Sequence, residues 1–305
     1  MNGKILEKYG KDSLKEELLP QIASGKKFIG IASTEPSGGS DIAGIRTTAT
    51  KVEGGFKLNG EKIFISGIRE AKELGGGFLT LAKTSLERSS KALSMFYLPI
   101  DAKGVETTLY NTIGRKGIST GALTLNDVFI PDDYLLWEIG RGFHQAFEGF
   151  NYARVIIAGA AIGAAHYMLD YTIEYVKSRV LFEKPLAKFE GVQFPIVEHW
   201  AKLEAFWTLT LKAAWALDML NKGEISISEV NKYVASVKLY AVHEAYETAK
   251  ECLLLLGTLG YTDETPADMT VRGILSYMAG AEGTPNIMKI ILTRELIGKE
   301  YLAYR

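Results

Sequence analysis

Two short polar segments hold the residue types best suited to binding a ligand or doing chemistry. Residues 33–41, with the sequence STEPSGGSD, combine hydroxyl groups with glycines that let a ligand approach the backbone closely. Glu282 precedes a segment in which Thr284 can cap a helix and Pro285 can occupy its first position. A carboxylate in such a loop can act as a general base over a pocket, or it can be a solvated charge that the helix dipole favours.

Other common catalytic and metal-binding patterns do not occur in the sequence. There is no Walker phosphate loop, no Rossmann glycine fingerprint and no nucleophile elbow. His243-Glu244 begins like a zinc-protease motif, but position 247 is glutamate rather than histidine. Cys252 lies in the apolar run CLLLL, which favours a buried structural thiol. We therefore expect no metal site and treat the histidines as core or surface residues: His144, His166, His199 and His243.

The composition is that of an ordinary globular protein. Of 305 residues, 47% are hydrophobic and 23% are charged, which is enough apolar material for a sizeable core. The net charge of −1 favours neither a nucleic-acid groove nor a membrane-surface patch. A single cysteine excludes an internal disulfide and indicates a reducing cytoplasm. The start of the chain has no signal-peptide core, and apolar stretches such as 155–165 are too short to span a bilayer, so we expect buried helices there.

Seven strand-like runs in residues 28–130 predict a β domain. Asn59-Gly60, between two alternating runs, predicts a hairpin turn, and Gly54-Gly55 and residues 75–77 mark further breaks. Such spacing is typical of a compact β-barrel or sandwich of about 100 residues. The runs are FIGIAS, TTATKV, FKLNGEKIFIS, GGFLTLAKT, ALSMFYLPI, VETTLYN and GALTLNDVFI.

Helical patterns lie on both sides of this domain. Residues 3–23 form a short amphipathic helical region that Gly25 ends. Residues 141–178, 190–221, 227–256 and 284–304 are long and rich in alanine and leucine, which predicts a four-helix bundle. The sequence thus predicts an α+β fold with a helical segment over residues 1–27, a central β domain over 28–135 and a C-terminal bundle over 136–305.

The segment STEPSGGSD closely resembles the T-E-P-x-x-G-S-D signature of the acyl-CoA dehydrogenase family. Further segments resemble motifs of that family in the same order along the chain. They are residues 61–67 (EKIFISG), 127–131 with 140–143, 179–193, 256–261 (LGTLGY) and 281–287 (AEGTPNI). The resemblance runs from about residue 12 to 304, and it implies a flavoprotein of this fold that lacks most of the family's N-terminal helical domain.

The resemblance also implies roles for individual residues. Glu282 would be the base that takes the α-proton of an acyl-CoA thioester, while FAD accepts a hydride from the β-carbon. Arg179 and Phe182 would reach the FAD of a neighbouring subunit in a homo- or hetero-oligomer, a dimer or a tetramer, and an electron-transfer flavoprotein would take the electrons. The full set of implied cofactor contacts is Thr34, Gly39, Ser40, Phe64, Ser66, Arg179, Phe182, Phe189, Gly257, Thr284 and Asn286, and the substrate contacts are Ser40, Asn151 and Arg154.

Several positions depart from the family's pattern. Gly67 stands where asparagine is usual, Glu183 where glycine is usual and Glu190 where glutamine is usual. Leu254 also stands where glutamine is usual. The short N-terminal region, Glu190 and Leu254 motivate the first of two alternatives, and the retained Glu282 argues against the second. The first is a non-catalytic family member that serves as a structural partner in a hetero-oligomer. The second is a flavin enzyme of the same fold with different chemistry, such as an oxidase or monooxygenase.

Overall fold

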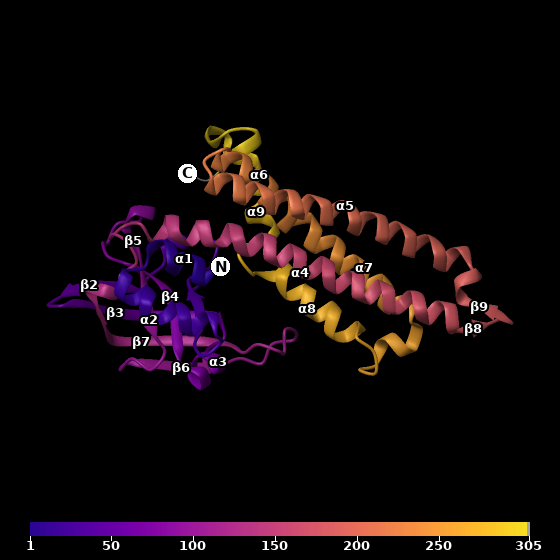
Figure 1. Ribbon diagram of the computed structural model, residues 1–305, viewed down its shortest axis with the longest axis horizontal. Helices are drawn as coiled ribbons and strands as arrows, with labels where there is room; N and C mark the ends of the chain where they lie inside the picture. Colours follow the sequence, from indigo (N-terminus) through magenta and orange to yellow (C-terminus); the bar gives the residue numbers. More distant parts are fainter. Residues whose placement is uncertain (304–305) are drawn as a thin grey trace. The chain divides into compact units, whose positions relative to one another are not determined.

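The structure is a computed structural model that describes residues 1–303 (Figure 1). The chain divides into two compact units, which we describe separately. The first comprises residues 1–112 and 116–150, and the second comprises residues 113–115 and the chain from residue 151 onward. Helix α4 (Gly142–Ser178) begins in the first unit and continues into the second.

The first unit is built around a seven-stranded mixed sheet. The strand order is β1-β4-β2-β3-β7-β6, and β5 pairs with β4 outside this order. Pairing is antiparallel except for β1 with β4 and a single bridge of β2 with β4. All seven predicted strands are present: β1 (Phe28–Ala32), β2 (Thr48–Val52), β3 (Gly55–Ser66), β4 (Gly76–Lys83), β5 (Leu93–Pro99), β6 (Val105–Leu109) and β7 (Thr120–Pro131).

The predicted helical region before the sheet is two helices, α1 (Asn2–Tyr9) and α2 (Asp12–Ala23). Their apolar faces are buried in one cluster with residues of β4 and β5. This is possible because apolar residues that repeat every 3.6 positions share one face of a helix, and those that repeat every second position share one face of a strand. This cluster contains Ile5, Leu6, Leu14, Leu18, Leu79, Leu81, Leu93 and Met95. A short helix, α3 (Ile68–Leu74), was not predicted.

The predicted hairpin turn at Asn59-Gly60 is wrong. Both residues lie inside β3, and the β2–β3 turn falls at residues 53–54, between the paired Val52 and Gly55. The pairing of β3 with β7 shifts register between Leu58 and Gly60, which marks a bulge. A Cβ at Gly60 would lie 2.7 Å from the Cα of Thr47, so close backbone approach rather than a turn requires glycine here.

The second unit is helical, and the predicted helices 141–178 and 190–221 agree with α4 and α5 (Glu190–Asn221). The predicted helix 227–256 is α6 (Ile227–Ser236), a π-helical turn (Val237–Ala241) and α7 (Val242–Leu255). Helix α8 (Ala267–Ala279) was not predicted. Helix α9 (Pro285–Leu296) ends earlier than the predicted residue 304, which lies outside the described residues. A small hairpin, β8 (Val180–Leu181) and β9 (Lys184–Pro185), joins α4 to α5.

The core of the helical unit brings small residues of different helices together. Ala158, Ala161 and Ala165 of α4 share one cluster with Ala213 and Ala216 of α5. Small side chains let helix axes approach closely and leave few voids. Helix α4 is long and apolar enough to cross a membrane. However, 56% of its most apolar 18-residue stretch is buried inside the protein, and the core helix of a globular protein can have the same length and composition.

Candidate functional site

The loop over residues 33–41 is anchored by a buried ion pair in the first unit. Lys62 Nζ of β3 lies 2.7 Å from Glu35 Oε1, and the two side chains are 0% and 3% exposed. The Glu35 carboxylate also accepts hydrogen bonds from the backbone N–H of Thr47 at 3.0 Å and from that of Arg46. In addition, Ile63 N–H donates to the Thr34 carbonyl oxygen at 2.9 Å. These contacts hold the loop along β3.

The electrostatics of this pair depend on both partners. Burial lowers the pKa of Lys62 to about 8, although Glu35 acts to raise it. Burial acts to raise the pKa of Glu35, but Lys62 and the N–H donors outweigh it and hold the pKa below its ordinary value. Sequence analysis missed this pair. Its signal was present, because Glu35 and Lys62 both belong to segments that resemble family motifs.

Phe64 is displayed at a second irregularity of β3. The β3–β7 register shifts between Lys62 and Ile65, and Phe64 has φ +57°, a strained value for a non-glycine residue. Phe64 is 66% exposed, and the centroid of its ring lies 5.7 Å from that of Tyr110. Ser66 ends the strand opposite Thr120. The structure therefore brings Thr34, Phe64 and Ser66 to one end of β3.

The structure explains why residue 67 is glycine. Gly67 has φ +91°, and a Cβ at this position would lie 2.0 Å from the ring of Phe28. Asparagine tolerates positive φ better than most residues, so it is the clash with Phe28 that disfavours the asparagine that the family usually has. Gly39 and Ser40 lie exposed near the end of the loop, where a Cβ at Gly39 would contact the Thr34 side chain at 3.2 Å.

A shallow cleft next to this loop carries mostly positive charge. Three basic side chains border it, and Asp41 forms an ion pair with one of them, Arg88, at 2.5 Å. Such a surface attracts anions such as phosphates. The lining residues are Ser37, Asp41, Gly44, Ile45, Arg46, Thr48, Lys83, Leu86 and Arg88.

Glu282, Asn151 and Arg154 are brought together in the second unit. Arg154 of α4 is 3% exposed, and its Nε donates to the Glu282 carbonyl oxygen at 2.9 Å. Its Nη1 donates to Asn151 Oδ1 at 2.9 Å, and Asn151 Nδ2 donates to Asn231 of α6 at 3.1 Å. Glu282 itself has φ +50°, in the loop between α8 and α9. Arg154 therefore holds a strained segment of backbone at the predicted base.

The surroundings of Glu282 favour a basic carboxylate. Burial raises its pKa, and the positive charges of Arg115, Lys238 and Arg154 only partly oppose this effect. Burial likewise lowers the pKa of Arg154 to about 10. A carboxyl group whose pKa is raised above its ordinary value is a stronger base, once ionised, than an exposed glutamate.

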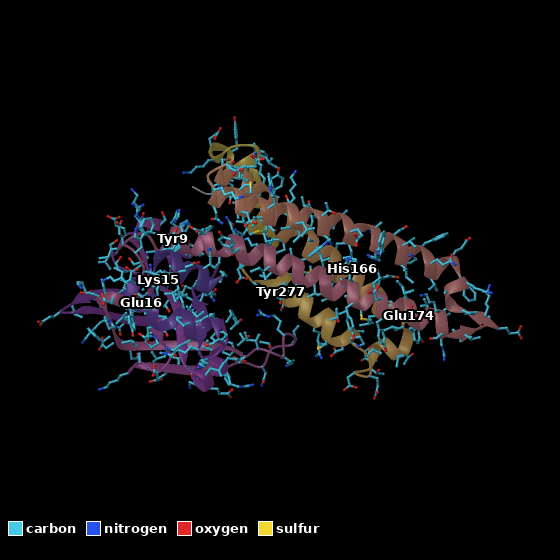
Figure 2. All side chains as sticks on the ribbon, viewed as in Figure 1. Tyr9, Lys15, Glu16, His166, Glu174 and Tyr277 are labelled. Atoms are coloured by element: carbon cyan, nitrogen blue, oxygen red, sulfur yellow. The ribbon has the colours of Figure 1, made fainter. Side chains whose placement is uncertain are left out.

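Sequence analysis missed Lys238, which belongs to the same cluster. Lys238 lies in the π-helical turn, is 2% exposed, and its Nζ donates to the Tyr277 carbonyl oxygen at 2.6 Å. Figure 2 labels Tyr277 on α8. Burial lowers the pKa of Lys238 to about 8 against the effect of Glu282. The available signal was a lone lysine in the apolar run VASVKLYA.

Arg179, Phe182 and Phe189 surround the β8–β9 hairpin. Phe182 and Glu183 form its two-residue turn with φ +51° and +62°, which explains why glycine is usual at position 183. Phe182 is 86% exposed, and its ring lies 6.3 Å from that of Phe189, the residue before α5. Arg179 is exposed at the end of α4. Glu190 begins α5, where the helix dipole favours a negative charge.

The remaining predicted contacts lie at helix ends. Gly257 follows α7 with φ +62° and opens a 3-10 turn. The predicted cap of α9 is confirmed, since Thr284 Oγ1 accepts from Ile287 N–H at 3.4 Å and Pro285 is the first helical residue. Asn286 is exposed in the first turn of α9.

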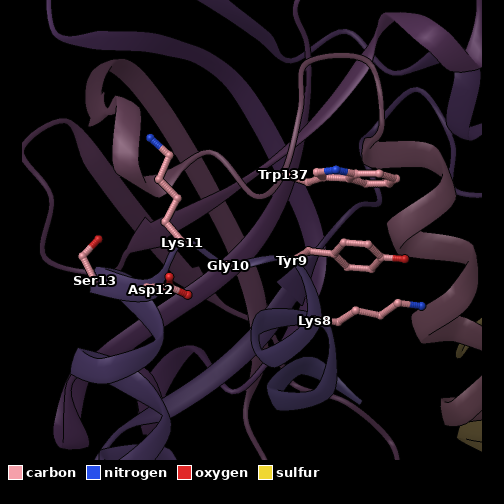
Figure 3. Close-up of a pocket in the computed structure, with 7 residues that line it drawn as sticks. All are labelled: Lys8, Tyr9, Gly10, Lys11, Asp12, Ser13 and Trp137. Carbon is pink, nitrogen blue, oxygen red and sulfur yellow. The ribbon is translucent and has the colours of Figure 1, made fainter.

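A separate open cleft in the first unit contains none of the predicted site residues (Figure 3). Residues 8–13 and Trp137 line it, and the rings of Tyr9 and Trp137 stack at 5.1 Å. The Tyr9 hydroxyl donates to Glu148 at 2.5 Å, and the Arg141 guanidinium lies 5.2 Å from the Trp137 ring. We interpret these contacts as structural, because they join α1 to the start of α4.

Comparison with known proteins agrees with this geometry in both units. Residues 30–128 match the family model of the acyl-CoA dehydrogenase middle domain, and residues 140–297 match that of the C-terminal domain. An acyl-CoA dehydrogenase of Bacillus subtilis (strain 168) is 30% identical over 300 residues, covering 95% of this chain and 74% of that protein. The mitochondrial isovaleryl-CoA dehydrogenase of Solanum tuberosum is 29% identical over 296 residues, with 97% and 69% covered. The structure of glutaryl-CoA dehydrogenase from Mycobacterium smegmatis in complex with FADH2 aligns with a TM-score of 0.88 at 26% identity, covering all of this chain and 74% of that one. The chain belongs to the acyl-CoA dehydrogenase family.

Proposed function

We propose that the protein is an FAD-dependent acyl-CoA dehydrogenase, or a subunit of one, in which Glu282 removes the α-proton of an acyl-CoA thioester. The observation that carries this proposal is the Glu282 cluster. A carboxyl group with a raised pKa lies in a loop that Arg154 holds through its main-chain oxygen. In the reaction the α C–H bond breaks and its proton moves to Glu282, while the β-carbon loses a hydride and the α,β bond becomes double.

The residues of the loop over 33–41 and the end of β3 fit a flavin. The Thr34 and Ser66 hydroxyls are hydrogen-bonding groups, and the exposed Phe64 ring offers an apolar face. Gly39 lies so close to Thr34 that a side chain would crowd the loop. When bound, FAD supplies the acceptor for the hydride. An electron-transfer flavoprotein is the proposed recipient of the electrons.

The visible absorption spectrum of the purified chain tests this function. We expect flavin bands after incubation with FAD, and bleaching of those bands under anaerobic conditions by one member of a panel of acyl-CoA thioesters. The thioester that bleaches the flavin would identify the acyl group of the substrate. A colourless protein that takes up no FAD would overturn the proposal and favour the structural partner of a hetero-oligomer.

The basic cleft next to the loop is a candidate for the phosphate end of the thioester. Reversing two of its charges in the variant K83E/R88E is expected to raise KM for a CoA thioester about tenfold, because phosphate attraction becomes repulsion. The KM for the same acyl group on pantetheine, which lacks the nucleotide phosphates, should not change. Steady-state kinetics with both substrates measure the difference.

The matched control for this test is K57E/K103E, which reverses two exposed lysines of the same unit that do not line the cleft. It should leave both KM values unchanged. An equal rise for the CoA and pantetheine thioesters in K83E/R88E would contradict a phosphate site in the cleft.

The tip of the β8–β9 hairpin is the proposed contact with the FAD of a neighbouring subunit. An 86% exposed phenylalanine at a strained turn gives little to the stability of its own chain. Because the proposed contact is with FAD, Phe182→Ala is expected to weaken FAD binding about tenfold. Because the side chain is exposed, the same change should alter the free energy of unfolding by less than about 0.5 kcal/mol.

Flavin fluorescence titration and chemical denaturation measure the two quantities for Phe182→Ala. The control is Met269→Ala, another strongly exposed apolar residue of the second unit, which should alter neither. Unchanged FAD affinity in Phe182→Ala would exclude this contact.

A further inference from the structure

Lys238 is directed into the protein interior by an irregular turn of helix. Residues 237–241 form a π-helical turn between α6 and α7, and four of them are buried: Val237, Lys238, Leu239 and Ala241. A π-helical turn inserts a residue into an α-helix and changes the direction of nearby side chains, and such turns are frequent at functional sites. The buried lysine is therefore a specific feature of this site rather than part of the apolar packing around it.

The hydrogen bond of Lys238 fixes the end of the helix that leads to Glu282. Its Nζ donates at 2.6 Å to the carbonyl oxygen of Tyr277, which lies in the last turn of α8, five residues before Glu282. The Arg115 guanidinium lies 5.3 Å from the ring centroid of Tyr277. On the other side of the loop, Arg154 holds the Glu282 carbonyl oxygen. Cations thus hold the main chain both before and at the candidate base.

Charge balance links the lysine to the Glu282 carboxylate. A carbonyl oxygen satisfies a proton of the ammonium group but does not neutralise its charge, which is costly to bury alone. The carboxylate that acts on both Lys238 and Arg154 is that of Glu282. The groups that act on Glu282 within the second unit are Arg154 from α4, Lys238 from the π-helical turn and Arg115 from residues 113–115. On α9, Arg294 acts on Arg154 and pairs with Glu295 at 2.6 Å.

We infer that Lys238 is a positioning residue for Glu282: it anchors the loop that carries the carboxylate and supplies positive charge next to it. This inference rests on the proposed role of Glu282 as the base. Without the lysine, only Arg115 and Arg154 would oppose the effect of burial, so the protonated carboxyl, which cannot accept a proton from the substrate, would be more favoured. This role would also explain the π-helical turn, because a regular helix would point the Lys238 side chain in another direction.

The test compares Lys238→Met, which removes the charged ammonium group but keeps most of the side-chain length, with Lys238→Arg, which keeps the charge. In the Met variant we expect the acid limb of the pH profile of kcat/KM to move about one unit toward alkaline pH. At pH values below the wild-type limb, kcat/KM should fall about tenfold, and it should recover at higher pH with little change in KM. In the Arg variant the limb should stay in place. The control is Lys250→Met, which removes an exposed charge from α7.

A measurement independent of turnover separates this inference from the proposed function. Carbon-13 NMR of labelled glutamate side chains, with the Glu282 signal assigned by Glu282→Gln, reports the carboxyl pKa directly. It should rise by about one unit in Lys238→Met. If that shift occurs while no thioester is oxidised by the wild-type protein, the proposed function fails and the coupling stands. If turnover occurs and the Glu282 pKa moves by less than about 0.3 unit, the inference is wrong.

The reciprocal experiment covers the case in which Lys238→Met does not fold. Because coupling between two titrating groups is mutual, Glu282→Gln should lower the pKa of Lys238 by a similar amount. Nitrogen-15 NMR of the labelled Lys238 ammonium group measures this pKa in the wild type and in Glu282→Gln. An unchanged Lys238 pKa in Glu282→Gln would overturn the inference, whatever the behaviour of the Met variant.

Discussion

Glu282→Gln is expected to lower kcat for thioester oxidation about a thousandfold or more while FAD remains bound, because the amide keeps the shape of the side chain but cannot accept the α-proton. Anaerobic stopped-flow measurement of flavin bleaching reports the proton-abstraction step, and equilibrium titration reports the FAD affinity. A Gln variant that retains substantial activity would exclude Glu282 as the base. Glu300→Gln, an exposed carboxylate beyond α9, serves as the control and should behave as the wild type.

The pH dependence of the wild-type enzyme follows from the same cluster. The base works as the ionised carboxylate, and burial raises the pKa at which that form appears. The value of kcat/KM should therefore fall as pH decreases through this raised pKa, at a higher pH than for an exposed glutamate. Loss of activity only below the ordinary range of glutamate would contradict the environment described here.

Lys62→Met is expected to have the largest effect on stability. It leaves the Glu35 carboxylate buried without its counter-charge, which should lower the free energy of unfolding by about 3–5 kcal/mol. FAD binding should weaken as well, because the loop over residues 33–41 loses its anchor on β3. Chemical denaturation followed by circular dichroism measures the first effect, and Lys57→Met, exposed on the same strand, should change stability by less than about 0.5 kcal/mol.

The double variant Glu35→Gln with Lys62→Met distinguishes charge burial from loss of packing. It removes both charges, so it should recover much of the stability that Lys62→Met loses. If the single and double variants were equally unstable, the ion pair would not be the cause.

Acid titration gives a second check on the same pair. The folded-state pKa of Glu35 lies below its unfolded value, so its contribution to stability is present at neutral pH and is lost as pH falls through the folded-state pKa. Stability near pH 4 should therefore depend on pH less steeply in the double variant than in the wild type. Equal pH dependence would show that Glu35 makes no such contribution.

Much of the fold was predictable because its signals are local. Seven strands appear where period-2 runs separated by turn residues predicted them, and α4 and α5 appear where long helical patterns predicted them. The N-cap of α9 is readable from Thr284-Pro285 alone, since a cap depends on residues within one turn. The wrong turn at Asn59-Gly60 shows the limit of this reasoning. Gly60 is required because the backbone of Thr47, the residue before β2, packs closely against it, and the local sequence does not reveal this contact.

The candidate site likewise has a part that the sequence predicts and a part that only the structure shows. Sequence by itself predicted which segments would carry the chemistry, from the residue types within each segment and from their resemblance to family motifs: residues 33–41, 61–67 and 281–287. Only the tertiary structure decided which partners set their charges. Lys62 reaches Glu35 across 27 residues, Arg154 reaches Glu282 across 128, and Lys238 reaches Tyr277 across 39. Such pairs form where packing removes water and brings distant elements together, and burial, which shifts the pKa values, is a property of the folded chain rather than of any local pattern.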